Sequence, residues 1–117
     1  MLTIDENRIY LTRGDTAEIA VSLKKLDDTD YEMQTGDVLY FRMKKYATKD
    51  PSEILIEKTA DVLNNEISFT IEPYDTESLA FGEYSYEVEL VTGAEEQHYT
   101  VIADSEFVIG KEIENHG

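Results

Sequence analysis

The chain of 117 residues fits a single domain with one core, and its 41% hydrophobic and 31% charged residues fall in the ordinary globular range. Ten lysines and arginines against 26 aspartates and glutamates give a formal charge of −16, which disfavours nucleic acid and anionic membranes as partners. The absence of cysteine excludes disulfides, thiolate metal sites and a cysteine nucleophile.

Alternation of apolar and polar side chains is the dominant signal, and it is typical of strands with one buried face. It predicts strands, in chain order, over residues 8–12, 16–24, 39–44, 54–59, 66–72, 84–90 and 99–102, the last continuing through 107–109. Turn-forming segments separate them, among them Arg13-Gly14-Asp15, Asp27-Asp28-Thr29-Asp30, Gly36-Asp37, Asn64-Asn65 and Gly93. The chain is therefore expected to be all-β, an immunoglobulin-like antiparallel β-sandwich of about seven strands.

Residues 73–79 depart from this alternation and predict one short helical turn that carries the chain from one sheet to the other. Asp75 or Thr76 is expected to cap the turn. The residues after it resemble the corner before strand F of immunoglobulin-like domains, in which a tyrosine hydroxyl bonds to nearby backbone. The members of this structural corner are Leu79, Gly82, Tyr84 and Tyr86. Tyr84 is the candidate for the hydroxyl bond, and Tyr86 is expected in the inner layer.

The predicted domain covers residues 1–110, and residues 111–117 read as a polar C-terminal tail that frays. No apolar run approaches the ~18 residues that a membrane span requires. The first residues lack the charged and apolar regions of a signal peptide, so the protein is expected to be made in the cytoplasm.

Two short motifs have both a functional and a structural interpretation. Arg13-Gly14-Asp15 is the tripeptide of integrin ligands, but Gly14 lies between two predicted strands, where a turn needs it. The acidic loop at Asp27-Asp28-Thr29-Asp30, with Glu32 nearby, offers oxygen ligands of the kind that calcium prefers. It lacks the spacing, central glycine and distal glutamate of an EF-hand, so a solvated turn is the preferred interpretation.

No catalytic, cofactor-binding or metal-binding residue is predicted. His98 and His116 are far apart in the sequence, and His116 belongs to the predicted tail. Carboxylates are so numerous that pairs occur by chance, and the chain has no Gly-rich phosphate loop, nucleophile elbow or HExxH pattern. The chain is accordingly expected not to be an enzyme and to hold no cofactor.

Aromatic side chains are the remaining candidates for a binding surface, because they anchor both protein interfaces and sugar-binding platforms. Five of the twelve tyrosines and phenylalanines fall on core-facing positions: Tyr84, Tyr86, Phe41, Phe69 and Phe107. The candidate interaction surface consists of Tyr10, Tyr31, Tyr40, Tyr46 and Tyr74.

Several segments together resemble the small immunoglobulin-like proteins of phages and prophages of Gram-positive bacteria, in particular the N-terminal domain of upper baseplate proteins. They are Ile9 to Thr16, Gly36-Asp37 leading to Phe41-Arg42-Met43-Lys44-Lys45, Ile71-Glu72-Pro73 with Asp75-Thr76, the stretch from Leu79 through Gly82-Glu83-Tyr84 to Leu90, and Phe107-Val108-Ile109-Gly110. The resemblance spans nearly the whole chain. In long members of that family a helical or fibrous segment follows this domain, whereas the present sequence ends at Gly117.

The resemblance implies a structural or assembly role in a phage tail or baseplate, exerted through contacts with tail or baseplate proteins or with further copies of the chain. It also implies a place in the virion after synthesis in the bacterial host cytoplasm. A stand-alone virion or accessory protein and a segment of a longer chain both remain open. The alternative function is that of an adhesive β-sandwich that binds carbohydrate or a receptor, which predicts a cluster of exposed aromatic residues at one loop end.

Overall fold

The computed structural model describes residues 2–5, 7–25, 27, 29–46, 53–61, 67–93 and 95–111. Almost all of its regular structure is β-strand, so the all-β prediction is confirmed. The strands are β1 (Leu2–Asp5), β2 (Arg8–Thr12), β3 (Ala17–Val21), β4 (Val38–Lys44), β5 (Ile54–Asp61), β6 (Ile67–Ile71), β7 (Gly82–Val91) and β8 (His98–Gly110). The helix α1 (Pro73–Thr76) is a single turn.

The strands form because their side chains alternate, and the alternation predicts which face is buried. Burial alternates along the whole of β3 and β7, with the apolar side chains inside. The predicted strands at 8–12, 54–59 and 99–109 are present as β2, β5 and β8, and β8 runs without interruption through the polar residues between its two predicted parts. The strand β1 was not predicted from the sequence.

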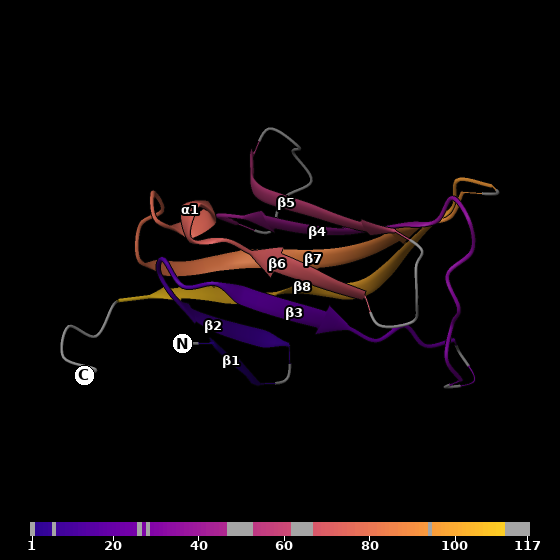
Figure 1. Ribbon diagram of the computed structural model, residues 1–117, viewed down its shortest axis with the longest axis horizontal. Coiled ribbons are helices and arrows are strands. Elements are labelled where there is room, and N and C mark those ends of the chain that lie inside the picture. The colour runs from indigo at the N-terminus through magenta and orange to yellow at the C-terminus, as the bar shows by residue number, and fades with distance from the viewer. Residues whose placement is uncertain are drawn as a thin grey trace.

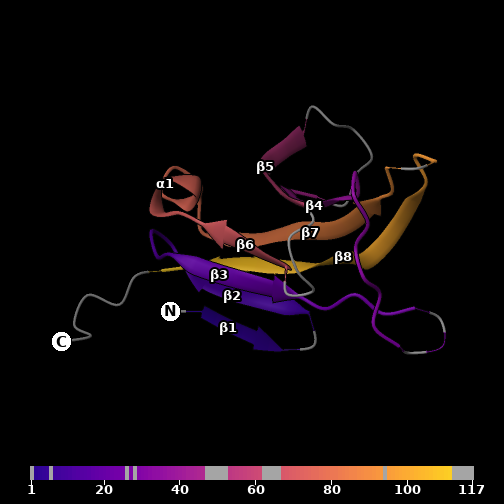
Figure 2. The same ribbon diagram turned by 45° about the vertical axis from the view of Figure 1, so that its right-hand side comes forward.

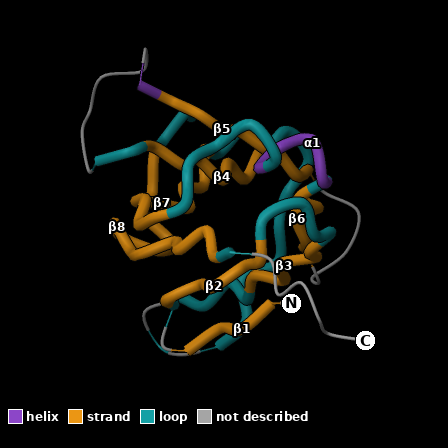
Figure 3. Tube along the Cα trace, turned by 90° about the vertical axis from the view of Figure 1, so that its left-hand side faces the viewer, coloured by secondary structure: helices purple, strands orange, loops and turns teal. Residues whose placement is uncertain are grey.

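The strands build two layers. Six of them form a sheet in the order β1-β2-β8-β7-β4-β5, and β3 pairs with β6 in a separate two-stranded sheet. The β3–β6 pair lies over one face of the large sheet (Figures 1 and 2), and the end-on view shows the large sheet curling around that pair, from β1 and β2 at one side to β5 at the other (Figure 3).

The prediction of a purely antiparallel arrangement is wrong at one pair of strands. β2 pairs with β8 in parallel, with Ile9 beside Phe107 and Leu11 beside Ile109, and the other pairs are antiparallel. A parallel pair needs a long crossover rather than a hairpin, and here nearly the whole chain separates its two strands. Local alternation carries no information about such a pairing. The immunoglobulin-like arrangement itself stays a prediction.

The core lies between the two layers and is centred on four aromatic rings. The Phe69 ring of β6 lies 5.7 Å from that of Phe41 on β4, which links the small sheet to the large one. Tyr86 stacks on Phe41 at 5.3 Å, and Phe107 meets both of these rings edge-on. Such pairs contribute about 0.5–1.5 kcal/mol each beyond the area they bury. All four rings are buried, as is Tyr84, so the sequence assigned these five aromatic residues to the core correctly.

The helical turn lies within the predicted range 73–79, but its cap is not the predicted one. Its N-cap is Glu72, whereas the sequence pointed to Asp75 or Thr76. Pro73 occupies the first helical position, and the Asp75 carboxylate reaches back to accept a hydrogen bond of 2.8 Å from the Glu72 N–H. Thr76 is fully buried, and its hydroxyl oxygen accepts a 2.9 Å bond from the N–H of Gly14. As expected, the turn carries the chain from the small sheet at β6 to the large sheet at β7.

The corner residues lie where α1 leads into β7. The Tyr84 hydroxyl donates a 2.6 Å hydrogen bond to the carbonyl of Ala80, and the Tyr86 hydroxyl donates to the carbonyl of Asn7 in the β1–β2 turn. Leu79 packs against the core, and Gly82 adopts a φ of +142°, a region that side chains with a Cβ rarely occupy. These contacts hold the entry to β7 in one conformation.

Candidate interaction surface

The structure does not bring the five candidate tyrosines together. Tyr46 and Tyr74 lie near one end of the molecule, at the end of β4 and in α1, and are 71% and 66% exposed. Tyr31 lies in the β3–β4 connection at the opposite end, and Tyr40 lies in the middle of β4. Tyr10, on β2, is 39% exposed, and a Cβ at Gly110 would overlap its ring.

The end of β4, the helix α1 and the start of β7 lie at one end of the fold (Figure 1), and exposed aromatic side chains lie on these segments. Phe81, which the sequence did not single out, joins Tyr46 and Tyr74 there and is 42% exposed. We call this surface the α1 end. It comprises Arg13, Lys45, Tyr46, Lys58, Tyr74 and Phe81.

Three cations at the α1 end lie over aromatic rings. The Arg13 guanidinium is 4.0 Å from the Phe81 ring centroid. The Lys45 ammonium is 4.5 Å from the ring of Tyr84, and the Lys58 ammonium is 5.7 Å from that of Tyr74. Each such contact is worth about 0.5–1 kcal/mol at an exposed site. Lys58 also pairs with Asp75 of α1 at 2.8 Å, which holds the Lys58 ammonium beside this helical turn.

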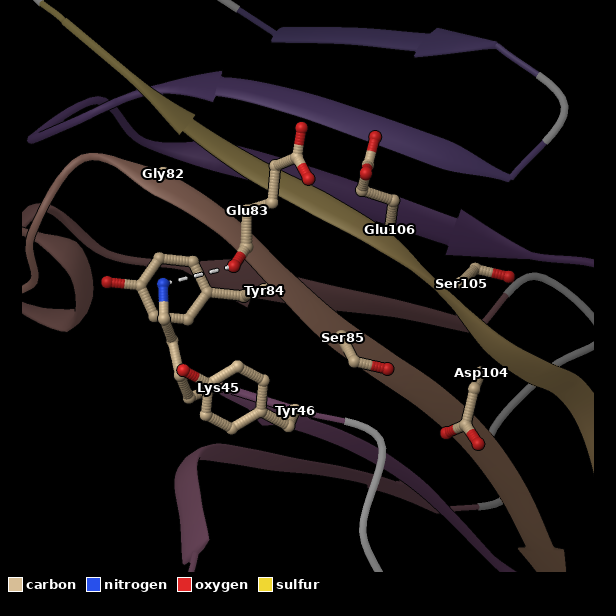
Figure 4. Close-up of a pocket in the computed structure, with 9 residues that line it drawn as sticks. All are labelled: Lys45, Tyr46, Gly82, Glu83, Tyr84, Ser85, Asp104, Ser105 and Glu106. Atoms are coloured by element: carbon tan, nitrogen blue, oxygen red, sulfur yellow. Dashed lines mark hydrogen bonds between the residues drawn. The ribbon is translucent and has the colours of Figure 1, made fainter.

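A groove of about 770 Å³ borders the α1 end and is open along much of its length. Lys45 and Tyr46 line it from the end of β4, and the carboxylates of Glu83, Asp104 and Glu106 line it from β7 and β8 (Figure 4). The Lys45 ammonium donates to the Glu83 carbonyl at 3.3 Å, and the Glu106 carboxylate is paired with Arg8. The groove is thus acidic beside an aromatic rim.

The Arg13-Gly14-Asp15 turn is part of this end and is tied to its neighbours. The Arg13 side chain donates to the Leu79 carbonyl at 3.3 Å besides covering Phe81. Gly14 adopts a φ of +85° and donates its N–H to Thr76. Both observations favour the structural interpretation of the tripeptide, because an integrin ligand presents it on a mobile loop with the arginine free.

The acidic loop forms an ordinary turn within the described residues. The Asp27 carboxylate accepts hydrogen bonds from the N–H and hydroxyl of Thr29, which lower the pKa of Asp27 below its usual value. Asp30 pairs with Lys24, while Asp28 lies outside the described residues. In the part of the chain that the structure describes, no three histidine, aspartate or glutamate side chains converge as metal ligands do.

A charged network covers the outer face of the large sheet around Tyr40. The Arg42 guanidinium lies 4.4 Å from the Tyr40 ring and bonds to Glu57 at 2.8 Å and to Glu89 at 3.0 Å. Burial raises the pKa of Glu89. The hydrogen bonds and positive charge of Arg42 and His98 lower this pKa by more than burial raises it, so the net shift is downward. This network accounts for Tyr40 and His98 without a ligand. His116 lies outside the described residues.

Comparison of the chain with protein-family models, curated proteins and solved structures returned no match. Among the described residues, no helix has the length and apolar character needed to cross a bilayer.

Sequence reasoning missed three exposed apolar side chains: Leu55, Phe81 and Tyr99. Tyr99 and Leu55 lie in predicted strands, where one face is normally buried, and Phe81 lies between a predicted turn and a predicted strand. The available signal was the pair Phe81-Gly82, since an aromatic residue before a turn glycine has no strand face on which to pack.

Proposed function

We propose that the chain is a non-enzymatic structural protein that works through protein–protein contacts, and that it belongs to a bacteriophage tail or baseplate. The observation that carries the contact role is the α1 end, where exposed Tyr46, Tyr74 and Phe81 are combined with cations held over aromatic rings. The phage context is supported by the sequence resemblance to the N-terminal domain of upper baseplate proteins.

The composition of the α1 end fits a protein partner. Tyrosine, phenylalanine and arginine are enriched at interface cores and among the residues whose truncation weakens binding most. The Arg13 turn and α1, which carries Tyr74, are held by the Gly14–Thr76 and Lys58–Asp75 contacts, so these two segments have little conformational entropy left to lose on docking. The adjacent acidic groove offers carboxylates to a lysine or arginine of the partner.

Two features support an immunoglobulin-like β-sandwich as the finer description of the fold. The β3–β6 pair packs face to face on the large sheet. The Tyr84 hydroxyl bonds to the backbone four residues upstream, as in the tyrosine corner of such domains. A sandwich of this kind suits an assembly protein, because it presents rigid ends and strand edges to its neighbours.

The test is light scattering over a concentration series, with the chain alone and with purified tail and baseplate proteins encoded beside it. We expect a discrete oligomer or a complex with one of these proteins. Truncation at the α1 end, by Tyr74→Ala and Phe81→Ala, should weaken that association roughly thirtyfold, because loss of a dominant interface residue costs about 2 kcal/mol or more. Tyr99→Ala is the matched control, since Tyr99 is 50% exposed but lies at the opposite end.

The assembly role would be refuted if the chain stays monomeric at every concentration and binds none of the tail and baseplate proteins. An association unaffected by the two truncations, or weakened equally by Tyr99→Ala, would place the contact elsewhere and refute the assignment of the α1 end.

A further inference from the structure

The two layers differ in length at the end opposite α1, and this difference leaves a groove. The small sheet ends at Val21, whereas β7 continues to Val91 and β8 starts at His98. The chain that follows β3 passes beside the uncovered part of β7 and β8 (Figure 2). The resulting groove has a volume of about 570 Å³, within the range of small-ligand pockets.

Apolar and aromatic side chains form much of the groove. Leu23 and Leu90 are almost fully buried and belong to the core, and Val101 packs against it. Tyr31 is half-buried, and Tyr99 is 50% exposed, so the Tyr99 ring is available to a ligand. Exposed aromatic rings in a groove provide the flat apolar surface on which a sugar ring stacks.

Tyr31 is held in place before any ligand binds. Its hydroxyl donates a 2.6 Å hydrogen bond to the buried Asp37 carboxylate, which also accepts 2.9 Å and 3.1 Å bonds from the N–H groups of Gln34 and Gly93. The Tyr99 hydroxyl is bonded to the Gln97 side chain. The Tyr31 ring is therefore preorganised, which reduces the entropy lost on binding.

The polar lining of the groove consists of hydroxyls and cations. Ser22, Thr92 and Thr100 supply hydroxyls, and Lys24 and Lys25 supply positive charge. No carboxylate is among the lining residues that the structure describes, although 26 of the 117 residues are acidic. Lys24 is paired with Asp30, and Lys25 also lines a neighbouring hollow that contains Asp30 and Glu32. Among the described residues Lys25 forms no ion pair, so its ammonium is the lining cation that a ligand can engage. The groove thus differs from the acidic groove beside Lys45.

We propose that this groove binds an acidic saccharide, a sugar whose ring stacks on Tyr99 and whose carboxylate or phosphate pairs with Lys25. The combination of apolar side chains and hydroxyls in the lining matches a sugar ring, which has apolar faces and hydrogen-bonding edges. A groove lined by two lysines and by no described carboxylate, in a chain of charge −16, matches a negatively charged substituent, because most of the surface charge elsewhere repels it. This site is separate from the α1 end and does not depend on the assembly role.

The experiment is a titration of the ¹⁵N-labelled chain followed by amide chemical shifts. The probes are trigalacturonic acid, its neutral methyl ester, glucose 6-phosphate and a glutamate-rich peptide. We expect the two acidic sugars to shift amides of residues 22–25, 31, 90–92 and 99–101, and the methyl ester to bind at least about tenfold more weakly.

Two variants test the residues. Tyr99→Ala and Lys25→Gln should each weaken binding of the acidic sugars by about tenfold or more. Both side chains are exposed, and an unchanged amide spectrum outside the groove shows that each variant is folded. Tyr74→Ala, at the other end, is the matched control and should leave binding unchanged.

Any of four results would overturn the proposal: no shifts with either acidic sugar, shifts centred outside the groove, equal binding of the methyl ester, or equal binding of the peptide. Retention of affinity in Tyr99→Ala would overturn the stacking role. The assembly test probes the α1 end with protein partners, whereas this test probes the groove with sugars. Either proposal can therefore fail while the other stands.

Discussion

Asp37 joins the β3–β4 connection to the β7–β8 turn at the groove end, and its replacement by asparagine tests how much of the structure depends on one buried carboxylate. The side chain is only 2% exposed. One carboxylate oxygen accepts from the Tyr31 hydroxyl and the Gln34 N–H, and the other accepts from the Gly93 N–H. Asparagine has the same shape but replaces one of these acceptor oxygens with a donor NH₂ group.

The expected loss follows from the better of the two amide orientations. If the amide oxygen faces Tyr31 and Gln34, its NH₂ group faces the Gly93 N–H, so one hydrogen bond worth about 1 kcal/mol is replaced by a contact between two donors. The two retained bonds lose their charge, which costs about 1 kcal/mol each. Relief from burying a charge offsets part of this sum. We expect Asp37→Asn to lower the free energy of unfolding by about 2–3 kcal/mol.

Urea unfolding measures this change through the transition midpoint at constant slope. Asp27→Asn is the control, because Asp27 also accepts from a turn N–H and a hydroxyl but is exposed, and it should leave the midpoint unchanged. Equal midpoints for Asp37→Asn and the wild-type chain would refute the reasoning. So would equal shifts in the two variants.

The same cluster predicts a dependence of stability on pH at both extremes. Burial raises the pKa of Asp37, but the bonds from Tyr31, Gln34 and Gly93 outweigh it and the net pKa is below the usual 3.8. This contribution to the free energy of unfolding is therefore present above pH 4 and is lost as the pH falls through the lowered pKa.

At alkaline pH the relevant group is Tyr31. The Asp37 bond, burial and negative charge raise the pKa of Tyr31 to about 12, so its contribution to the free energy of unfolding is complete below pH 10 and is lost towards pH 12. In Asp37→Asn, unfolding midpoints measured against pH should lose the acid-side dependence attributed to Asp37, and an unchanged profile would contradict this assignment.

Three further substitutions test contacts elsewhere, each by the midpoint of urea unfolding. Thr76→Val removes the fully buried hydroxyl that accepts a hydrogen bond from the Gly14 N–H, and it should lower the free energy of unfolding by about 1–3 kcal/mol. An unchanged midpoint would mean that water replaces this bond. Tyr84→Phe deletes the bond to Ala80 and should cost about 1 kcal/mol, and no change would show the corner bond to be dispensable. Gly110→Ala places a methyl group on the Tyr10 ring and should cost about 1 kcal/mol, a loss that must vanish in a Tyr10→Ala background if the overlap is its cause.

The sequence by itself determined the local structure. Alternation along 16–24, 39–44 and 84–90 identified strands and their buried faces, because a strand shows its two faces in turn whatever its neighbours are. Residues 73–79 lack the alternation of a strand, and this marked the helical turn. The cap is Glu72 because Pro73 takes the first helical position and the Asp75 carboxylate accepts a hydrogen bond from the Glu72 N–H. Five core aromatics followed from the same pattern.

Only the tertiary structure decided which segments meet. The parallel β2–β8 pair, the strand β1 and the distribution of the five tyrosines over several surfaces depend on contacts between distant residues, which no local period encodes. Phe81 and Arg13 are 68 positions apart and meet only because β2 ends at the same side of the fold at which β7 begins. The groove at Tyr99 exists because two layers differ in length, and strand length is set by where the pairing partner stops.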